Sequence, residues 1–292
     1  MLIARLIADA EQVETRLDRA LSALSGAGFS IMSSGSLGSD REIVELSVDG
    51  GSPEALRAIV ETEMSPHAGL IARDAVQFPK LFVSDMDSTI IGQECIDELA
   101  DFAGLKDHVA AITERAMQGE IDFETALRDR VALLKDLDES AISQCLTDRI
   151  HPTEGARALV QTLRAGGCRT ALVTGGFHHF ADVVAEGVGF ERVVGNRLGV
   201  EGGKLTGGLV GPIADSATKL AVLREESARL HGGAILAAGD GANDIPMLEA
   251  ATYGFAFKAK AKARAAASCW IDEGDLTAIL RLLGIPQSDW VE

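Results

Sequence analysis

Two aspartates separated by one residue stand in the segment Asp85–Thr89, which reads Asp-Met-Asp-Ser-Thr and follows the apolar run Leu81–Val83. Such a run is typical of a buried parallel strand, and residues i and i+2 leave a strand on the same side. Two carboxylates held together repel each other unless a cation neutralises them, and Mg²⁺ takes oxygen ligands and bridges to phosphate. A carboxylate can also attack phosphorus and form an acyl phosphate. Taken alone, the segment is equally well explained as a solvated turn.

Three further polar features lie where other strands are expected to end or the next helix to begin. Gly239–Asp244 reads Gly-Asp-Gly-Ala-Asn-Asp and, like the segment Thr174–Gly176 (Thr-Gly-Gly), follows a short apolar run. A hydroxyl with free backbone amides at a helix start can hold phosphate, and Lys219 could add a positive charge. Each feature alone has an ordinary explanation as a glycine-rich turn or a solvated lysine. Since ligand sites in parallel sheets lie at the carboxyl ends of strands, their combination indicates one phosphate-handling site.

The elements that must position these residues alternate between apolar strands and amphipathic helices, which predicts an α/β fold with a doubly wound, Rossmann-like parallel sheet. Asp85 and Thr174 are 89 positions apart (174 − 85), whereas a right-handed crossover needs only about 30 residues. We expect the excess, about residues 93–150, to form an inserted helical cap. Residues 197–208 predict a hairpin.

The first part of the chain has a different pattern. Residues 1–77 read β-α-β-β-α, with a further strand expected near Ile71–Val76, which suggests a small α+β, ferredoxin-like domain. Pro79 marks the junction, so we predict two domains, 1–77 and 78–292. We expect the first to regulate the second or to form a homodimer, without contributing to the chemistry.

Composition limits the partners and the compartment. The 292 residues carry a formal net charge of −17, which disfavours nucleic-acid binding because phosphate backbones require basic surface. No apolar run approaches the roughly 18 residues needed to cross a bilayer, so no membrane partner is expected. Charged residues begin at Arg5 and Asp9, too early for a signal peptide. The four cysteines form no C-x-x-C pair, which fits reduced thiols and a cytoplasmic location.

Several segments together resemble the haloacid dehalogenase (HAD) superfamily, and within it the phosphoserine phosphatase family. The resemblance covers about residues 80–285 and is highly specific. Where many relatives have Ser before Gly-Gly, this chain has Thr174, which keeps the hydroxyl. The matching segments are Asp85–Thr89 with Glu94 and Ile96–Ala100; Ile112–Gly119, Asp122 with Phe123, and Arg130–Leu134 in the cap; and Pro152–Ala156, Gly175–Phe177, Asn196–Leu198, Gly203–Gly207 and Gly239–Asp244.

The resemblance implies hydrolysis of O-phospho-L-serine to L-serine and phosphate, the last step of serine biosynthesis, through a phospho-aspartate. Asp85 would be the nucleophile and Asp87 the general acid and base. Mg²⁺ would be held by the side chains of Asp85 and Asp240 and by the backbone carbonyl of Asp87. Asp244 would hold the waters of the metal.

The substrate would be held by the core and by the cap together. The resemblance implies that Thr174, Gly175 and Lys219 bind the phosphoryl oxygens, with Asn243 beside them. The charges of phosphoserine must also be paired if they are buried: Glu94 can reach the ammonium, and Arg130 offers a planar fork that matches the carboxylate. In the cap, Met117 and Phe123 are either lid residues that exclude water or ordinary packing within the cap.

The family also includes members with N-terminal amino-acid-sensing domains of the ACT type, and the pattern of residues 1–77 is compatible with an ACT-like domain. Two alternatives stay open at this point. One is a HAD phosphatase or phosphotransferase for another small phosphomonoester, because such enzymes share the core and differ in the cap. The other is a non-catalytic amino-acid-sensing regulator, against which the intact set of Asp85, Asp87, Lys219 and Asp240 argues.

Overall fold

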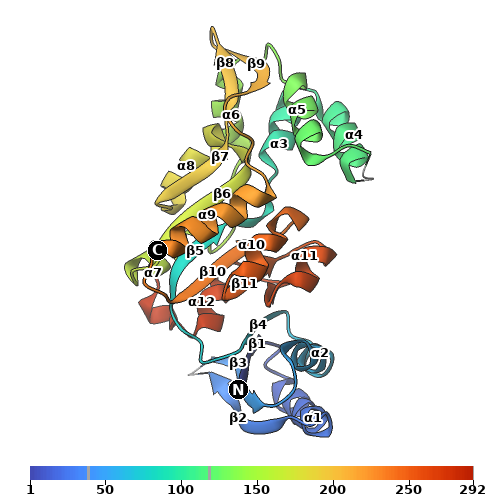
Figure 1. Ribbon diagram of the computed structural model, residues 1–292, viewed down its shortest axis with the longest axis vertical. Coiled ribbons are helices and arrows are strands. Elements are labelled where there is room, and N and C mark those ends of the chain that lie inside the picture. The colour runs from blue at the N-terminus through green and yellow to red at the C-terminus, as the bar shows by residue number, and fades with distance from the viewer. Residues whose placement is uncertain (38–39, 118–119, 292) are drawn as a thin grey trace.

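A ten-stranded sheet runs through the computed structural model, which describes residues 1–37, 40–117 and 120–291 (Figure 1). The strand order across the sheet is β2 (Ser30–Leu37), β3 (Asp40–Asp49), β1 (Leu2–Ile7), β4 (Ala68–Ala72), β12 (Cys269–Ile271), β11 (Tyr253–Phe257), β10 (Ala234–Gly239), β5 (Pro79–Ser84), β6 (Arg169–Phe177) and β7 (Arg192–Asn196).

The strands from β12 to β7 are parallel and carry helices on both faces, which confirms the predicted Rossmann-like fold. Side chains that alternate along β5 and β6 enter two separate apolar clusters, as the two-residue period of a strand requires. One face packs against α7 (Ala156–Ala165), α8 (His178–Val188) and α12 (Thr277–Leu283), and the other against α9 (Ser216–Ala228), α10 (Ile245–Ala250) and α11 (Ala261–Ala266).

The segment between β5 and α7 folds into the helices α3 (Cys95–Phe102), α4 (Lys106–Met117), α5 (Phe123–Leu133) and α6 (Ser140–Arg149), as expected for a helical cap. The expected hairpin also forms, from β8 (Leu198–Glu201) and β9 (Lys204–Leu209). It reaches from the core to the cap (Figure 1), where Leu205 exchanges backbone hydrogen bonds with Asp136 (2.9 Å) and Leu137 (2.8 Å) in the turn after α5. The hairpin and the cap are therefore attached to each other.

The N-terminal residues form β1, α1 (Val13–Gly26), β2, β3, α2 (Pro53–Met64) and β4, the β-α-β-β-α-β order of the ferredoxin-like motif. The predicted last strand near residues 71–76 lies earlier, at Ala68–Ala72. These five residues are all buried, whereas Arg73 and Asp74 are exposed. Helices α1 and α2 cover one face of this part of the sheet, and α12 from the C-terminal part of the chain packs against the other.

The two parts of the chain meet at β4 and β12, which pair antiparallel with Leu70 opposite Cys269. The side chain of Trp270 on β12 is fully buried within the apolar cluster of the N-terminal unit, residues 1–77. Its ring lies where a Cβ on Gly69 would come within 2.4 Å, so a glycine is required there. The boundary near residue 77 stays a prediction, but sheet and core are continuous across it.

None of the helices among the described residues combines the length and the apolar character that crossing a bilayer requires.

Candidate active site

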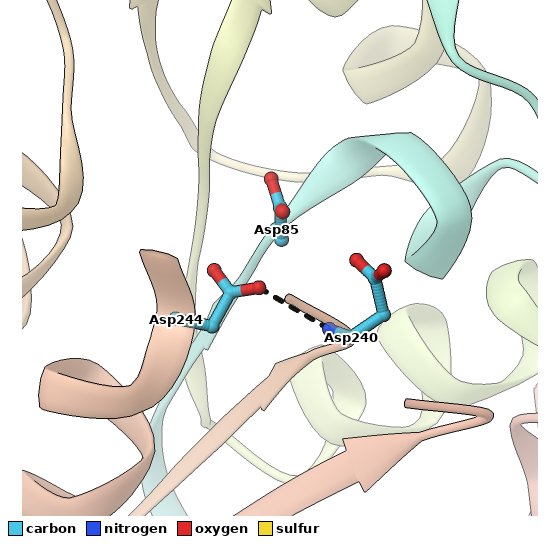
Figure 2. A group of neighbouring side chains, drawn as sticks. All are labelled: Asp85, Asp240 and Asp244. Carbon is cyan, nitrogen blue, oxygen red and sulfur yellow. Dashed lines mark hydrogen bonds between the residues drawn. The ribbon is translucent and has the colours of Figure 1, made fainter. Parts of the chain in front are cut away.

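Three aspartates converge at the carboxyl ends of two neighbouring strands (Figure 2). Asp85 follows β5, Asp240 follows β10, and Asp244 lies in the short turn after Asp240. Each is buried, and each contributes a carboxylate oxygen to a group in which these atoms lie within 4.8 Å of one another. The parallel pairing of β5 with β10 brings them together, and the backbone N–H of Asp85 donates to the carbonyl of Ala238 at 3.0 Å.

Lys219 on α9 inserts its ammonium between two of these carboxylates. Its Nζ lies 2.7 Å from Asp85 Oδ2 and 2.6 Å from Asp244 Oδ1, and its side chain is 1% exposed. The other oxygen of Asp244 accepts hydrogen bonds from the backbone N–H groups of Asp240 (3.2 Å) and Gly241 (3.0 Å). Lys219 therefore fixes the orientation of the predicted nucleophile.

The charges of this cluster fit a divalent cation. Three carboxylates face one buried ammonium, Lys219, and the exposed Lys260 approaches Asp240 at 3.9 Å, so the ionised carboxylates outnumber the cations in a space of low solvent access. Burial and the charge of Asp244 raise the pKa of Asp85, and the same two causes raise the pKa of Asp240 to about 6. Oxygen atoms alone make up the donor set, which is the chemistry that Mg²⁺ prefers.

Asp87 lies apart from the three clustered carboxylates. Its Oδ1 accepts from the backbone N–H of Cys95 at 3.2 Å, and its Oδ2 is close to Gly176, where a Cβ would lie 2.8 Å away. Burial and the charge of Glu94 raise the pKa of Asp87 to about 7. A carboxyl with such a pKa can give and take a proton near neutral pH. The predicted role of its backbone carbonyl at a metal stays a prediction.

The segment Thr174–Gly176, called the phosphate loop below, lies beside these acids. The sequence predicted that the strand ends at Val173, but β6 continues irregularly to Phe177, with its pairing to β7 interrupted over the loop. Thr174 Oγ1 accepts from the Gly176 N–H at 2.8 Å, which leaves the threonine hydroxyl hydrogen free to donate to a ligand. Glycine is required at Gly176 because any side chain would collide with Asp87.

A cavity of about 760 Å³ opens between the cap and the core, and Lys219 forms part of its wall. Gly175 and Asn243, both predicted to lie at the phosphate, also line it. Phe123 lines it from the cap, with its ring edge 3.3 Å from where a Cβ on Gly175 would be. The side chain of Met117, the other predicted lid residue, lies outside the described part of the structure.

The predicted substrate clamp, Glu94 and Arg130, is not among the residues that line this cavity, but both interact electrostatically with Asp87. Glu94 is exposed and its Oε1 accepts from Ser88 Oγ at 2.8 Å. Arg130 is half-buried on α5, where burial lowers its pKa and the charges of Asp97, Glu94 and Asp87 oppose that shift. The cap residues that line the cavity beside Phe123 are Asp122, Glu124 and Arg128, to which sequence analysis assigned no binding role.

Two residues near the site had no role assigned from the sequence. Asn196 ends β7 and binds the carbonyl of Gly175, and the rule that strand ends carry sites would have found it. Lys260, the other residue, lies between β11 and α11. Its side chain is 65% exposed, but its Nζ lies 3.9 Å from Asp240 Oδ2 and its backbone N–H donates to the Asp240 carbonyl.

Comparison with known proteins gives consistent matches. The model of the haloacid dehalogenase-like hydrolase family matches residues 82–249. A phosphoserine phosphatase of Archaeoglobus fulgidus is 40% identical over 254 residues, which cover 83% of this chain and 73% of that protein. A haloacid dehalogenase family hydrolase from Salmonella enterica serovar Typhi has a similar structure, with a TM-score of 0.82, 26% identity and coverage of 97% of this chain and 99% of that one.

A solved phospho-aspartyl intermediate analogue of phosphoserine phosphatase is also similar, with a TM-score of 0.64 and 38% identity over 70% of this chain and 99% of that one.

Proposed function

The chain belongs to the phosphoserine phosphatases of the haloacid dehalogenase-like hydrolase family and hydrolyses phosphoserine, and we propose that it does so through a covalent phosphate on Asp85. The observation that carries this proposal is the buried Asp85 carboxylate, which Lys219 holds beside the phosphate loop. The substrate is O-phospho-L-serine and the products are L-serine and phosphate, which makes this the last step of serine biosynthesis.

The proposed reaction has two steps. In the first, an oxygen of Asp85 attacks phosphorus, the bond from phosphorus to the serine oxygen breaks, and Asp87 gives that oxygen a proton. In the second, Asp87 takes a proton from a water molecule, which attacks phosphorus and releases Asp85 and phosphate. The raised pKa of Asp87, about 7, supports both roles.

The residues around the reacting atoms would share the charge of the phosphoryl group. Thr174 can donate its hydroxyl and Gly175 its backbone N–H, and Lys219 supplies a positive charge. Mg²⁺, when bound by Asp85, Asp240 and the Asp87 carbonyl, would neutralise the transferring group. Asp244 would hold its waters.

Selection of phosphoserine would rest on Glu94 for the ammonium and Arg130 for the carboxylate. Burial and the charge of Glu94 raise the pKa of Asp87, and the charges of Glu94 and Asp87 both oppose the lowering of the Arg130 pKa by burial. These interactions support the assignment. A cap that closes only over both charges would couple recognition to the exclusion of water, and Phe123 over Gly175 would complete the closure.

The N-terminal unit is proposed to be an ACT-like regulatory or dimerising domain of a cytoplasmic enzyme. Its β-α-β-β-α-β order supports the ACT-like assignment. A cavity of about 770 Å³ between this unit and the catalytic part, lined by α2 residues such as Arg57 and α10 residues such as Leu248, offers space for a small effector.

The decisive experiment is turnover of phosphoserine with and without Mg²⁺, followed by rapid quenching to trap a phosphorylated enzyme. We expect turnover that chelation abolishes and added Mg²⁺ restores, with a phosphoenzyme that disappears in Asp85→Asn. Hydrolysis of phosphoserine without any phosphoenzyme would contradict the covalent mechanism, and inert phosphoserine beside a hydrolysed aryl phosphate would contradict the substrate.

A further inference from the structure

Asn196 is a buried amide that lies where the phosphate loop, the end of β7 and the segment before α9 meet. Its side chain is among the least exposed polar groups of the molecule, at 1% exposure. Its Nδ2 donates to the Gly175 carbonyl at 2.7 Å, and its Oδ1 accepts from the Ala214 N–H at 2.8 Å. The amide therefore joins two segments that both line the cavity.

The bond to Gly175 fixes one end of a single peptide unit. The carbonyl of Gly175 and the N–H of Gly176 belong to the same planar group. Asn196 binds its oxygen, and Thr174 Oγ1 binds its N–H at 2.8 Å on the opposite side. Because glycine stands on both sides of this unit, few steric barriers oppose its rotation. The two side chains thus choose one of two accessible orientations.

The orientation matters for the charge presented to a phosphate. As observed, the Gly175 carbonyl points to Asn196, and Thr174 keeps a hydroxyl hydrogen that can donate to a phosphoryl oxygen. After rotation, the carbonyl oxygen would face Thr174 and accept that hydrogen. A phosphate would then meet a carbonyl oxygen where it had met a donor, and preorganised donors are what stabilise developing negative charge.

We propose that Asn196 is a positioning residue which holds the Gly175–Gly176 peptide in the orientation that binds phosphate. This inference rests on the proposed function, because it assigns phosphate binding to the loop. Asn196 acts through Gly175 and does not itself touch the substrate.

Asn196 also joins the two ends of the segment that carries the hairpin. The chain leaves β7 at Asn196, forms β8 and β9 against the cap, and returns at Ala214, which binds the Asn196 side chain. The competing explanation is that Asn196 has a purely structural role and only holds the two ends of this segment together. It depends mainly on the 2.8 Å bond from the Ala214 N–H to Oδ1, with a longer 3.4 Å bond from Nδ2 to the Ala214 carbonyl, whereas the proposal depends on the 2.7 Å bond from Nδ2 to the Gly175 carbonyl.

Asn196→Asp separates the two explanations because a carboxylate of the same shape keeps the short bond from the Ala214 N–H, and loses the short bond to Gly175 together with only the long 3.4 Å bond to Ala214. We measure inhibition of aryl phosphate hydrolysis by inorganic phosphate, and direct phosphate binding by calorimetry. Phosphate should bind on the order of 10-fold more weakly or worse, as expected for loss of a donor that orients a phosphate contact. The KM values for phosphoserine and aryl phosphate should rise together, and the variant's crystal structure should show the rotated peptide.

Two further variants make the test decisive. Asn196→Ala removes the donor without adding charge and should weaken phosphate binding similarly, including if Asn196→Asp fails to fold. Gln161→Glu is the matched control, because it makes the same chemical change at a remote bond, from Nε2 to the Val188 carbonyl at 2.9 Å, and should leave phosphate binding unchanged. Wild-type phosphate affinity in a folded Asn196→Asp or Asn196→Ala protein would overturn the proposal. If the variants bind phosphate weakly but the wild type does not turn over phosphoserine, only the assignment of the substrate would be contradicted.

Discussion

Lys219 shows how one buried residue can organise a catalytic centre. Burial alone would lower its pKa, but Asp85 and Asp244 outweigh burial and raise it, so that the ammonium stays charged. Asp85, the proposed nucleophile, and Asp244, which accepts from the backbone N–H groups of Asp240 and Gly241, are thereby connected through one cation. Sequence analysis offered Lys219 as a possible positive charge, but only the resemblance assigned it to the phosphoryl oxygens, since a lone lysine ten positions after the end of β9 (219 − 209) carries no specific signal.

If Asp85 is the nucleophile, Asp85→Asn should abolish turnover while the protein stays folded. The amide fills the same volume but cannot form an acyl phosphate. Asp87→Asn should lower kcat by about 10²–10⁴-fold, the usual contribution of general acid and base catalysis. Steady-state rates and thermal unfolding of both variants measure this, and near wild-type activity of Asp85→Asn would refute the mechanism.

Arg130 is expected to determine the choice of substrate. Arg130→Ala should lower kcat/KM for phosphoserine by about 10²-fold, or about 2.7 kcal/mol, because the substrate carboxylate loses its partner. Hydrolysis of an aryl phosphate should hardly change. Arg157→Ala on α7 is the matched control, since Arg157 is exposed, donates to the Gly187 carbonyl and does not line the cavity. Equal losses on both substrates, or a larger effect of Arg157→Ala, would count against the assignment.

At the scale of elements, Glu226 attaches α9, the helix that carries Lys219, to the sheet. Its carboxylate is fully buried and pairs with Arg169 at the start of β6, with Arg192 at the start of β7, and with Arg229 at 2.7 Å. Burial raises the pKa of Glu226, but hydrogen bonds from Arg169 and Arg192 outweigh it and hold the pKa below its usual value. The position of Lys219 therefore depends on an ion-pair cluster remote from the substrate.

The sign of this shift predicts a pH dependence of stability. A carboxyl whose pKa is lowered by folding stabilises the protein above its unfolded pKa, about 4.3 for Glu, and loses that contribution as the pH falls through the folded value. Glu226→Gln should cost about 3 kcal/mol at neutral pH, the lower end for a broken buried ion pair. Denaturant unfolding at several pH values should show the difference between the two proteins shrinking below about pH 4.3. A difference that is constant with pH would exclude the ion pairs as its cause.

Local patterns predicted most of the catalytic elements. The predicted alternation of strands and helices was confirmed, with α7 ending before Gly166 and α9 beginning after Asp215, which forms a capping box. The strand ends that carry Asp85 and Asp240 were also confirmed. The irregular end of β6 was missed because Thr-Gly-Gly resembles a turn and only pairing with β7 extends it. Asn196 was missed because its role depends on contacts with residues 18 and 21 positions away.

At the scale of the whole molecule, the joint between the two parts rests on Trp270. No local pattern identified it, because β12 has only three residues and pairs with a strand from the other end of the chain. The guanidinium groups of Arg57 and Arg264 lie 4.8 Å and 4.5 Å from the ring centroid. Arg57 also donates to the carbonyls of Ala267 (2.6 Å) and Arg264 (2.7 Å).

Trp270→Ala should therefore destabilise both parts together, by about 3–5 kcal/mol as for other buried aromatic side chains. Denaturant unfolding followed separately in the N-terminal unit and at the active site should give coincident transitions. Trp290→Ala, which removes the other tryptophan near the C-terminus, should cost less because that ring is only partly buried. Two separate transitions in the wild-type protein would show that the parts unfold independently.

The pairing of β4 with β12 also has a consequence for synthesis of the chain on the ribosome. Leu70 and Cys269 are 199 positions apart (269 − 70), so β4 emerges long before its second neighbour is made. Until residues 269–271 appear, the inner edge of the nascent N-terminal unit offers unpaired backbone groups to any other strand, the situation in which edge strands recruit wrong partners. The joint between the two parts of this enzyme therefore forms only after the three residues of β12 have been synthesised. A chain released before codon 269 would lack β12 and could not pair its N-terminal unit with the rest of the sheet.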